Sequence, residues 1–258
     1  MRLFGSRERH GTRENMSDTL GCFGKLKFEE IDELQRCFAE SENYWVDAVP
    51  FRNDGDGVCS IDTVVLDPLQ MSASVAIAIL HAVNDIYAAR SRPTSISVSL
   101  TVPTSFDVNA LHEIGATIKS CAEQINCTIG KLHTSRSDCP PTLTACAIGS
   151  SPIASLALAP QGVVWLLDEL SDPWEAIKTF DFLALEPRIF MREFAANRKG
   201  VQLKDVSGDG LAGTLYQLCL RHRLSINLNK NFLLSLVNQS ALDACNRDKK
   251  VCGLFTSY

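Results

Sequence analysis

Strict alternation of apolar and hydroxyl residues over residues 94–102 constrains the fold more than any other feature of the sequence. The apolar set is Ile96, Val98, Leu100 and Val102, and the hydroxyl set between them is Ser95, Ser97, Ser99 and Thr101. Successive side chains of a strand point to opposite faces of a sheet. The alternation therefore predicts a strand that buries one face and leaves the other for solvent or a partner.

Helical patterns flank this strand on both sides. Residues 72–90 and 110–125 repeat apolar side chains every three or four positions, which predicts two amphipathic helices. Pro93 ends the first helix, and Asp107 or Asn109 is a suitable N-cap for the second.

The same reasoning assigns the other elements of the chain. Strands are predicted within 53–65, 128–132, 142–149, 161–167, 224–228 and 251–256, with a polar loop at 133–141. Helices are predicted at 27–39, 187–197, 211–218 and 232–245. Strands and helices alternate, so the expected class is α/β or α+β.

Composition suggests three segments. Residues 1–20 form a polar, arginine-containing tail for which disorder is expected. A run of small residues at 150–159 is the best candidate boundary between an N-terminal α/β domain (21–150) and a shorter C-terminal α+β domain (151–258). The cytoplasm is the expected compartment. An organelle transit peptide is the alternative, and Glu8 and Glu14 count against it.

Charge and cysteine spacing argue against several classes of function. The formal net charge of −5 argues against a general nucleic-acid binder. The sequence contains no unbroken run of about 18 apolar residues, so no membrane span is expected. Ten cysteines occur without a C-x-x-C pair, which predicts reduced thiols rather than a zinc site.

The stretch KDVSGDGLAGTLYQL, residues 204–218, is the strongest candidate for a functional site. Asp205 and Asp209 lie four residues apart in a turn rich in Gly and Ser, directly before the predicted helix. A helix N-terminus presents free N–H groups that suit a phosphate, and neighbouring carboxylates suit a metal ion bound to that phosphate. Helix capping is the structural alternative for the same residues.

A second group of acids lies earlier in the chain. Asp54, Asp56 and Asp62 enter or occupy the strand predicted within 53–65, and Asp85 follows Asn84 late on the helix 72–90. These acids are either magnesium ligands or ordinary turn and surface residues. The required late Glu is missing, which excludes an EF-hand, and the common nucleotide-binding and hydrolase motifs are absent.

The order of these motifs resembles that of the thiamine-monophosphate kinases, in the aminoimidazole-ribonucleotide-synthetase-like superfamily. The resemblance covers roughly residues 26–234. The segments that carry it are, in order, CSIDTVV, HAVNDIYAARSRP, SISVSLTVP, HTSRS with LTACAIG, LALEPRI and DVSGDGLAGTLYQL.

This resemblance implies a fold, an activity and a set of site residues. The expected fold is an N-terminal α/β domain that forms a homodimer through a β-barrel, followed by an α+β domain. The expected activity is phosphorylation of thiamine monophosphate by Mg-ATP. The implied Mg²⁺ ligands are Asp56, Asp62, Asp85, Asp205 and Asp209. The implied nucleotide-binding residues are Gly55, Asn84, Ser207, Gly208 and Gly210, and weaker candidates are Lys131, His133 and Arg136.

Several departures from the family pattern favour a second hypothesis. Gly57 replaces an Asp, and the sequence Lys131-Leu132-His133 replaces Gly-Gly-Asp. Ala89-Arg90-Ser91 replaces Met-Gly-Ala, Gly208 is an insertion, and the family's Gly-Gly-Glu-Asp segment has no counterpart. Because hard cations prefer oxygen ligands, His133 is a poor substitute for a carboxylate. The second hypothesis is a catalytically degenerate relative that serves as a binding or assembly subunit with a protein partner.

A third hypothesis comes from GCFGKL, residues 21–26. This segment loosely resembles the Cys-Gly-Cys-Lys segment of selenophosphate synthetases. It would make Cys22 a reactive thiol whose pKa the neighbouring Lys25 lowers. A cysteine that precedes a helix by chance is the structural alternative.

Overall fold

The computed structural model describes residues 48–50, 57–150, 170–171, 180, 185–197, 203–206, 210–223, 225–227 and 256–257. The first group of elements is β1 (Val49–Pro50), β2 (Val58–Val65), α2 (Met71–Ala88), β3 (Pro93–Val102), α3 (Val108–Ile125), β4 (Thr128–Arg136) and β5 (Thr142–Gly149). The later elements are β6 (Leu170–Ser171), α5 (Leu185–Asn197), α6 (Gly210–His222) and β7 (Thr256–Ser257).

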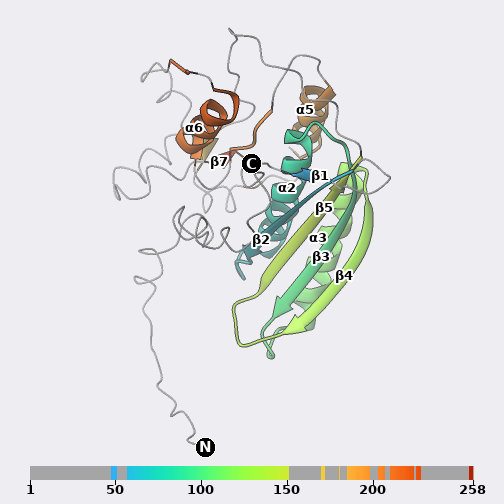
Figure 1. The fold of residues 1–258 in the computed structure, drawn as a ribbon. Coiled ribbons are helices and arrows are strands. Elements are labelled where there is room, and N and C mark those ends of the chain that lie inside the picture. The colour runs from blue at the N-terminus through green and yellow to red at the C-terminus, as the bar shows by residue number, and fades with distance from the viewer. Residues whose placement is uncertain are drawn as a thin grey trace, which may run out of the picture.

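Strands β1 to β5 form one mixed sheet in the order β1-β2-β5-β3-β4 (Figure 1). All neighbouring pairs are antiparallel except β3 and β4, which run parallel. Helix α3 connects these two strands, as a parallel pair requires a crossover. The architecture is the α/β fold that the sequence predicts.

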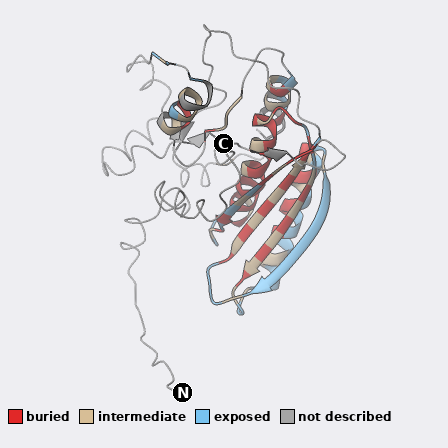
Figure 2. Cartoon of the chain, in the orientation of Figure 1, coloured by how far each residue is buried: buried red, intermediate tan, exposed pale blue. Residues whose placement is uncertain are grey.

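Helices α2 and α3 cover one face of the sheet, and the core lies between them and the strands (Figures 1 and 2). The strands bury every second residue against these helices, including Val64, Val98 and Leu143. The helices are joined by polar contacts as well, because Ser72 Oγ donates to Glu113 Oε1 at 2.6 Å. The alternation over residues 94–102 therefore arises, as predicted, from a strand that buries one face.

Helix α2 is the most buried element of the described chain. By length and composition it is apolar enough to cross a membrane, with a mean hydropathy of 1.3 over 18 residues. However, 78% of that segment is buried inside the protein, which is typical of a central core helix. Its apolar character therefore reflects contact with the sheet, α3 and α5.

The ends of the helices follow ordinary capping chemistry. Asp107 is the N-cap of α3 and accepts a hydrogen bond from the Asn109 N–H at 3.3 Å, as the sequence predicts. Asn126 ends α3 in the left-handed conformation with φ 57°. Arg90 follows α2 with φ 58°, so this turn keeps a left-handed residue although the resembled family has Gly here.

The other face of the sheet has no described helix over it (Figure 2). Its central rows carry hydroxyl groups that pair across strands, such as Thr63 with Thr144 at 2.9 Å and Thr101 with Ser135 at 2.8 Å. Ile61 on β2 is 68% exposed on this side. All nine residues of the edge strand β4 are exposed.

Two predicted elements differ from the structure. Residues 133–136 belong to β4 rather than to a loop, because they continue the parallel pairing with β3 as far as Arg136. Residues 225–227 form no strand. The predicted elements at 27–39, 161–167 and 232–245 lie outside the described residues, as do the tail 1–20 and most of the 150–159 boundary. The three-segment division of the chain therefore stays a prediction.

Candidate functional site

The polar side chains that reach the apolar side of the sheet meet where β2 packs on α2. Ser60 lies on the face of β2 that is turned toward α2, and its Oγ donates a short hydrogen bond to Asp85 Oδ2. Asp62 is two residues further along the same strand, so it lies on the same face at about 7 Å along β2. The structure therefore places two predicted metal ligands on one side of the sheet.

Asp62 lies beside a small side chain on the next strand. Asp62 is half-buried, and its cross-strand neighbour is Ala145, which has a small side chain. On the next row of the same face the pair is Val64 and Leu143, both fully buried. The carboxylate thus lies at the point where the apolar core gives way to polar groups.

Asn84, the neighbour of Asp85 on α2, is held by helix α5. Arg192 Nε donates to Asn84 Oδ1 at 2.6 Å, across 108 residues of sequence. Helix α5 docks through a face spaced at i, i+3, i+4 and i+7. The residues of this face are Ile189, Arg192, Glu193 and Ala196. Of these, Ile189 and Ala196 are buried in the core.

Two further contacts tie α5 to the turn after α2. Arg90 Nε donates to the Ala196 carbonyl oxygen at 3.4 Å, and the Arg90 side chain is buried. Arg92 Nε lies 3.9 Å from Glu193 Oε1 near the surface. The arginine in the turn after α2 therefore has a structural role, since it anchors the C-terminal part of α5.

Tyr87 on α2 is buried near Glu193 and Arg192 of α5 and carries an unusual hydroxyl group. Among the described residues, the Tyr87 hydroxyl is the buried side-chain atom that has no hydrogen-bond partner. Burial, followed by the negative charge of Glu193, raises the pKa of this phenol well above its ordinary value. The hydroxyl therefore stays protonated and costs stability where it lies.

The second predicted site, before α6, has an ion pair already in place. Lys204 Nζ lies 2.7 Å from Asp205 Oδ1, and only 6% of the lysine side chain is exposed. Thr214 Oγ1 donates to the Asp205 carbonyl oxygen at 3.3 Å, which fixes this segment against α6. Gly210 is the first residue of α6, as the motif predicts. A metal ion at Asp205 would have to compete with the ammonium group.

The donor chemistry of these residues fits Mg²⁺, because carboxylate oxygens are its preferred protein ligands. Within the described part of the chain, however, no group of three or more His, Cys, Asp or Glu side chains lies together as a metal site. Asp62, Asp85 and Asp205 therefore do not form such a group by themselves. The other predicted site residues lie outside the described residues: Asp56, Asp209, Gly55, Ser207 and Gly208.

The weaker candidates all lie on the exposed edge strand β4. The Lys131 N–H donates to Ser97 Oγ at 3.0 Å, so the backbone at this point is tied to β3. Arg136 Nη1 donates to the carbonyl oxygens of Pro103 and Thr104 at 3.1 and 2.6 Å. The Arg136 guanidinium thus fixes the loop before α3. His133 pairs in register with Ser99 on the open side of the sheet.

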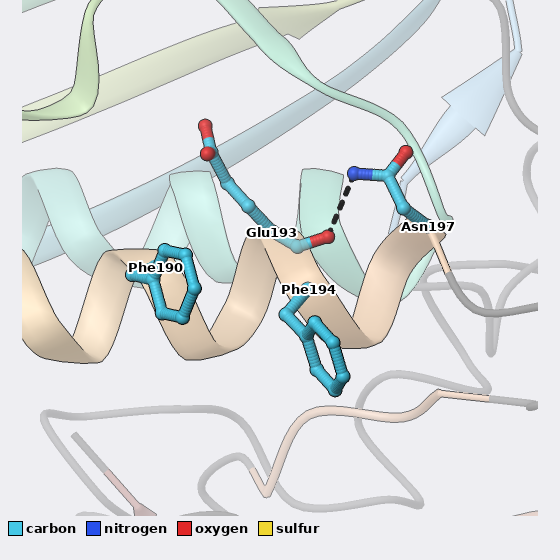
Figure 3. A pocket seen from close by; sticks show the side chains of 4 residues that line it. All are labelled: Phe190, Glu193, Phe194 and Asn197. Atoms are coloured by element: carbon cyan, nitrogen blue, oxygen red, sulfur yellow. Dashed lines mark hydrogen bonds between the residues drawn. The ribbon is translucent and has the colours of Figure 1, made fainter.

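An open hollow of about 310 Å³ lies on the outer side of α5 (Figure 3). Phe190 and Phe194 line it with stacked rings whose centroids are 6.5 Å apart. Asn197 Nδ2 donates to the Glu193 carbonyl oxygen at 2.8 Å beside them. The Glu193 carboxylate points away from Phe194, toward the opposite side of the helix (Figure 3). Glu193 lines the hollow together with Phe190, Phe194 and Asn197.

The cysteines give no second site within the described residues. Six of them are described, and all six are free thiols: Cys59, Cys121, Cys127, Cys139, Cys146 and Cys219. Cys22 and Lys25, the residues of the selenophosphate synthetase hypothesis, lie outside the described residues.

Sequence reasoning missed two residues of the site, Ser60 and Arg192. Ser60 had a local signal, since a polar residue at a buried strand position two before Asp62 shares its face. Arg192 had no such signal in the sequence, because its contact with Asn84 depends on how α5 packs against α2.

Comparison with known proteins supports the resemblance. Residues 46–151 match the family described as AIR synthase related protein, N-terminal domain. This segment contains β2, α2 and β5, and with them Ser60, Asp62, Asn84 and Asp85. Comparison with curated protein sequences finds no match.

Solved structures share the fold at low sequence identity. AaThiL complexed with AMPPCP and TMP is 16% identical with a TM-score of 0.59, over 91% of this chain and 84% of that one. Thiamine monophosphate kinase from Aquifex aeolicus is 17% identical with a TM-score of 0.56, over 76% and 74%. The HypE–HypF complex gives 15% identity and a TM-score of 0.57, over 84% and 77%. The chain thus has the AIR synthase-like α/β fold in residues 46–151 and resembles the thiamine-monophosphate kinases.

Proposed function

We propose that the chain binds ATP with Mg²⁺ beside Asp62 and Asp85 and transfers a phosphoryl group to thiamine monophosphate. The observation that carries this proposal is the Ser60–Asp85 hydrogen bond on the strand face that also holds Asp62. These are polar groups on a face of the sheet that is otherwise apolar. The complex of AaThiL with AMPPCP, an ATP analogue, supports a nucleotide as the ligand.

In this proposal each residue has a separate task. Bound Mg²⁺ would neutralise charge on the phosphates, which is the main chemical need of phosphoryl transfer. Asp62 and Asp85 would provide its carboxylate ligands, together with Asp56. Ser60 would orient Asp85 by donating to one of its carboxylate oxygens.

The segment before α6 would bind the phosphates from another side. Ser207, Gly208 and Gly210 would present N–H groups at the helix N-terminus. The nearly buried Lys204 ammonium adds positive charge beside Asp205. A phosphate that drew Lys204 toward itself would release Asp205 for the metal ion.

Calorimetric titration with AMPPCP, with and without Mg²⁺, tests the proposal. We expect magnesium-dependent binding that Asp62→Asn weakens at least about tenfold, since removal of one ligand charge weakens a hard-cation site. Asp138→Asn is the matched control, because Asp138 is an exposed loop residue. Absence of binding at millimolar nucleotide, or an equal loss in the control, would contradict the proposed site.

The substrate needs a separate measurement. Formation of thiamine diphosphate from thiamine monophosphate and ATP should require Mg²⁺ and should be lost in Asp85→Asn. Nucleotide binding without this turnover would remove the kinase activity and keep the nucleotide site.

A homodimer through the open face of the sheet is part of the proposal. Ile61 is 68% and Val65 37% exposed on this face, and the β4 edge is unpaired on its outer side within the described chain. Exposed apolar groups on a sheet face are typical of a partner surface. Light scattering should show a dimer that Ile61→Asp dissociates. A monomer at micromolar wild-type protein would contradict it.

A second candidate function is a binding or assembly subunit without catalysis. The observation in its favour is that Lys131, Leu132 and His133 lie on an exposed strand, next to a shift in its register with β3, where the resembled kinases have Gly-Gly-Asp. HypE, which shares the fold, has been solved in a complex with HypF. A wild-type turnover that Asp85→Asn abolishes would exclude this second function.

A further inference from the structure

Helix α5 brings a cation to the residue that precedes Asp85. Arg192 Nε lies 2.6 Å from Asn84 Oδ1, and the contact is part-buried. No local sequence pattern indicates this contact, because it joins residues that are 108 positions apart. The contact therefore raises the question of what an arginine does for Asn84.

Hydrogen-bond chemistry fixes which way the Asn84 amide is turned. A guanidinium group only donates, so the atom that faces Arg192 must be the amide oxygen. Asn84 then offers its N–H₂ group to other molecules. Its oxygen keeps a second lone pair, but the positive guanidinium beside it repels a metal ion at the same atom. An amide in this state donates to an anionic oxygen and is a poor ligand for a metal ion.

The orientation of the Asn84 amide matters for a nucleotide because Asn84 is next to Asp85. Asn84 and Asp85 are consecutive on α2, and Asp85 is fixed by Ser60 on the side of the sheet. Arg192 fixes Asn84 from the side of α5. Two neighbouring side chains are thus oriented from two different elements, one as an acceptor for cations and one as a donor to anions.

We propose that Arg192 is a positioning residue of the nucleotide site, and that it holds the Asn84 amide so that its N–H₂ group donates to a phosphate oxygen. This inference rests on the proposed function. It assigns Asn84 to the phosphate and not to the metal ion, and it makes the packing of α5 a requirement for tight nucleotide binding.

The neighbouring Arg92 provides a matched control. Arg92 also joins α5 to the region after α2, through Glu193 at 3.9 Å, but it has no contact with Asn84. A general loss of α5 packing should appear in both Arg92→Ala and Arg192→Ala. A specific effect on the amide should appear only in Arg192→Ala.

A double-mutant cycle on AMPPCP affinity with saturating Mg²⁺ tests the inference. We expect Arg192→Ala and Asn84→Ala each to weaken binding about tenfold, with little further loss in the double variant, because both remove the same contact. Arg192→Lys should weaken binding less than Arg192→Ala, since lysine still donates but lacks the planar fork. Arg92→Ala should bind like the wild type.

The remaining outcomes separate failure of the role of Arg192 from failure of the nucleotide site. Losses that add in the double variant, an equal loss in Arg92→Ala, or wild-type affinity in Arg192→Ala would overturn the role of Arg192 and leave the nucleotide site in place. Failure of the wild-type protein to bind AMPPCP would overturn the proposed function and this inference with it. Thermal melting of all variants identifies any that fail to fold, and Arg192→Lys then decides the case.

Discussion

The two faces of the five-stranded sheet are built from the same strands and differ in what they can do. The covered face buries Val64, Val98 and Leu143 under α2 and α3, and its polar exceptions gather at Ser60 and Asp62. The open face carries paired hydroxyl groups and the exposed Ile61. The buried apolar side chains of the covered face therefore provide most of the stability. A polar group on this face is costly to bury, so its presence points to a function. The second face is available for association.

Truncation in the covered face should produce the largest effect. Leu143 is fully buried at the centre of the sheet, so Leu143→Ala should lower the free energy of unfolding by about 2–5 kcal/mol. Ile61→Ala on the open face should cost under about 1 kcal/mol in the isolated chain. Urea unfolding of both variants measures the difference. Similar costs would contradict the assignment of the core to one face.

Glycine replacement gives a smaller contrast. A Cβ on Gly149 would lie 2.5 Å from Ile86 Cγ2 and 2.9 Å from Val58 Cγ2, so Gly149→Ala should destabilise the protein by about 1–3 kcal/mol. Gly115 on α3 has no atom within 4 Å of the same position. Gly115→Ala should therefore stabilise by about 0.5–1 kcal/mol. Opposite shifts in melting temperature are expected, and a destabilised Gly115→Ala would show that the outer face of α3 is covered.

Removal of the unpaired phenol should help slightly. Tyr87→Phe deletes a buried hydroxyl that has no partner, so we expect a gain of about 1 kcal/mol in the free energy of unfolding. Chemical denaturation measures it. A loss of more than about 1 kcal/mol would mean that the hydroxyl has a partner in solution.

The reactivity of the thiols should distinguish the buried Cys121 from the exposed Cys139, and no substitution is needed. Burial raises the pKa of Cys121 to about 12, so at pH 8 this thiol is almost wholly protonated and should resist alkylation in the folded protein. Its labelling should rise only as the pH approaches that value. Cys139 is exposed and should react first. Mass spectrometry of partially labelled protein gives the order.

The covered face was the part of the fold that sequence could predict. Alternation in β3 and helical repeats in α2 and α3 are local patterns, and the structure confirms all three elements. The prediction of a loop at residues 133–136 was wrong because β4 is exposed along its whole length. Burial therefore imposes no pattern on residues 133–136, and only the pairing with β3 defines them as a strand.

The sequence predicted the acidic residues of the candidate site but not the side chains that orient the site residues. Asp62 and Asp85 stand in motifs that can be read along the chain. Ser60 contacts Asp85 across 25 residues, and Arg192 contacts Asn84 across 108. Such contacts depend on how β2 and α5 pack on α2, which no local pattern records. Residue type alone therefore identified the charged groups and missed the ones that orient them.

Direct location of a metal ion would test the central claim, that the polar exceptions on the covered face form a magnesium–nucleotide site. The measurement is an anomalous difference map from crystals of the protein grown with AMPPCP and Mn²⁺ as the substitute for Mg²⁺. The account predicts a manganese peak within ligand distance of Asp62 or Asp85, with the Asn84 amide nitrogen at a phosphate oxygen. Nucleotide bound elsewhere, or manganese distant from both acids, would contradict it.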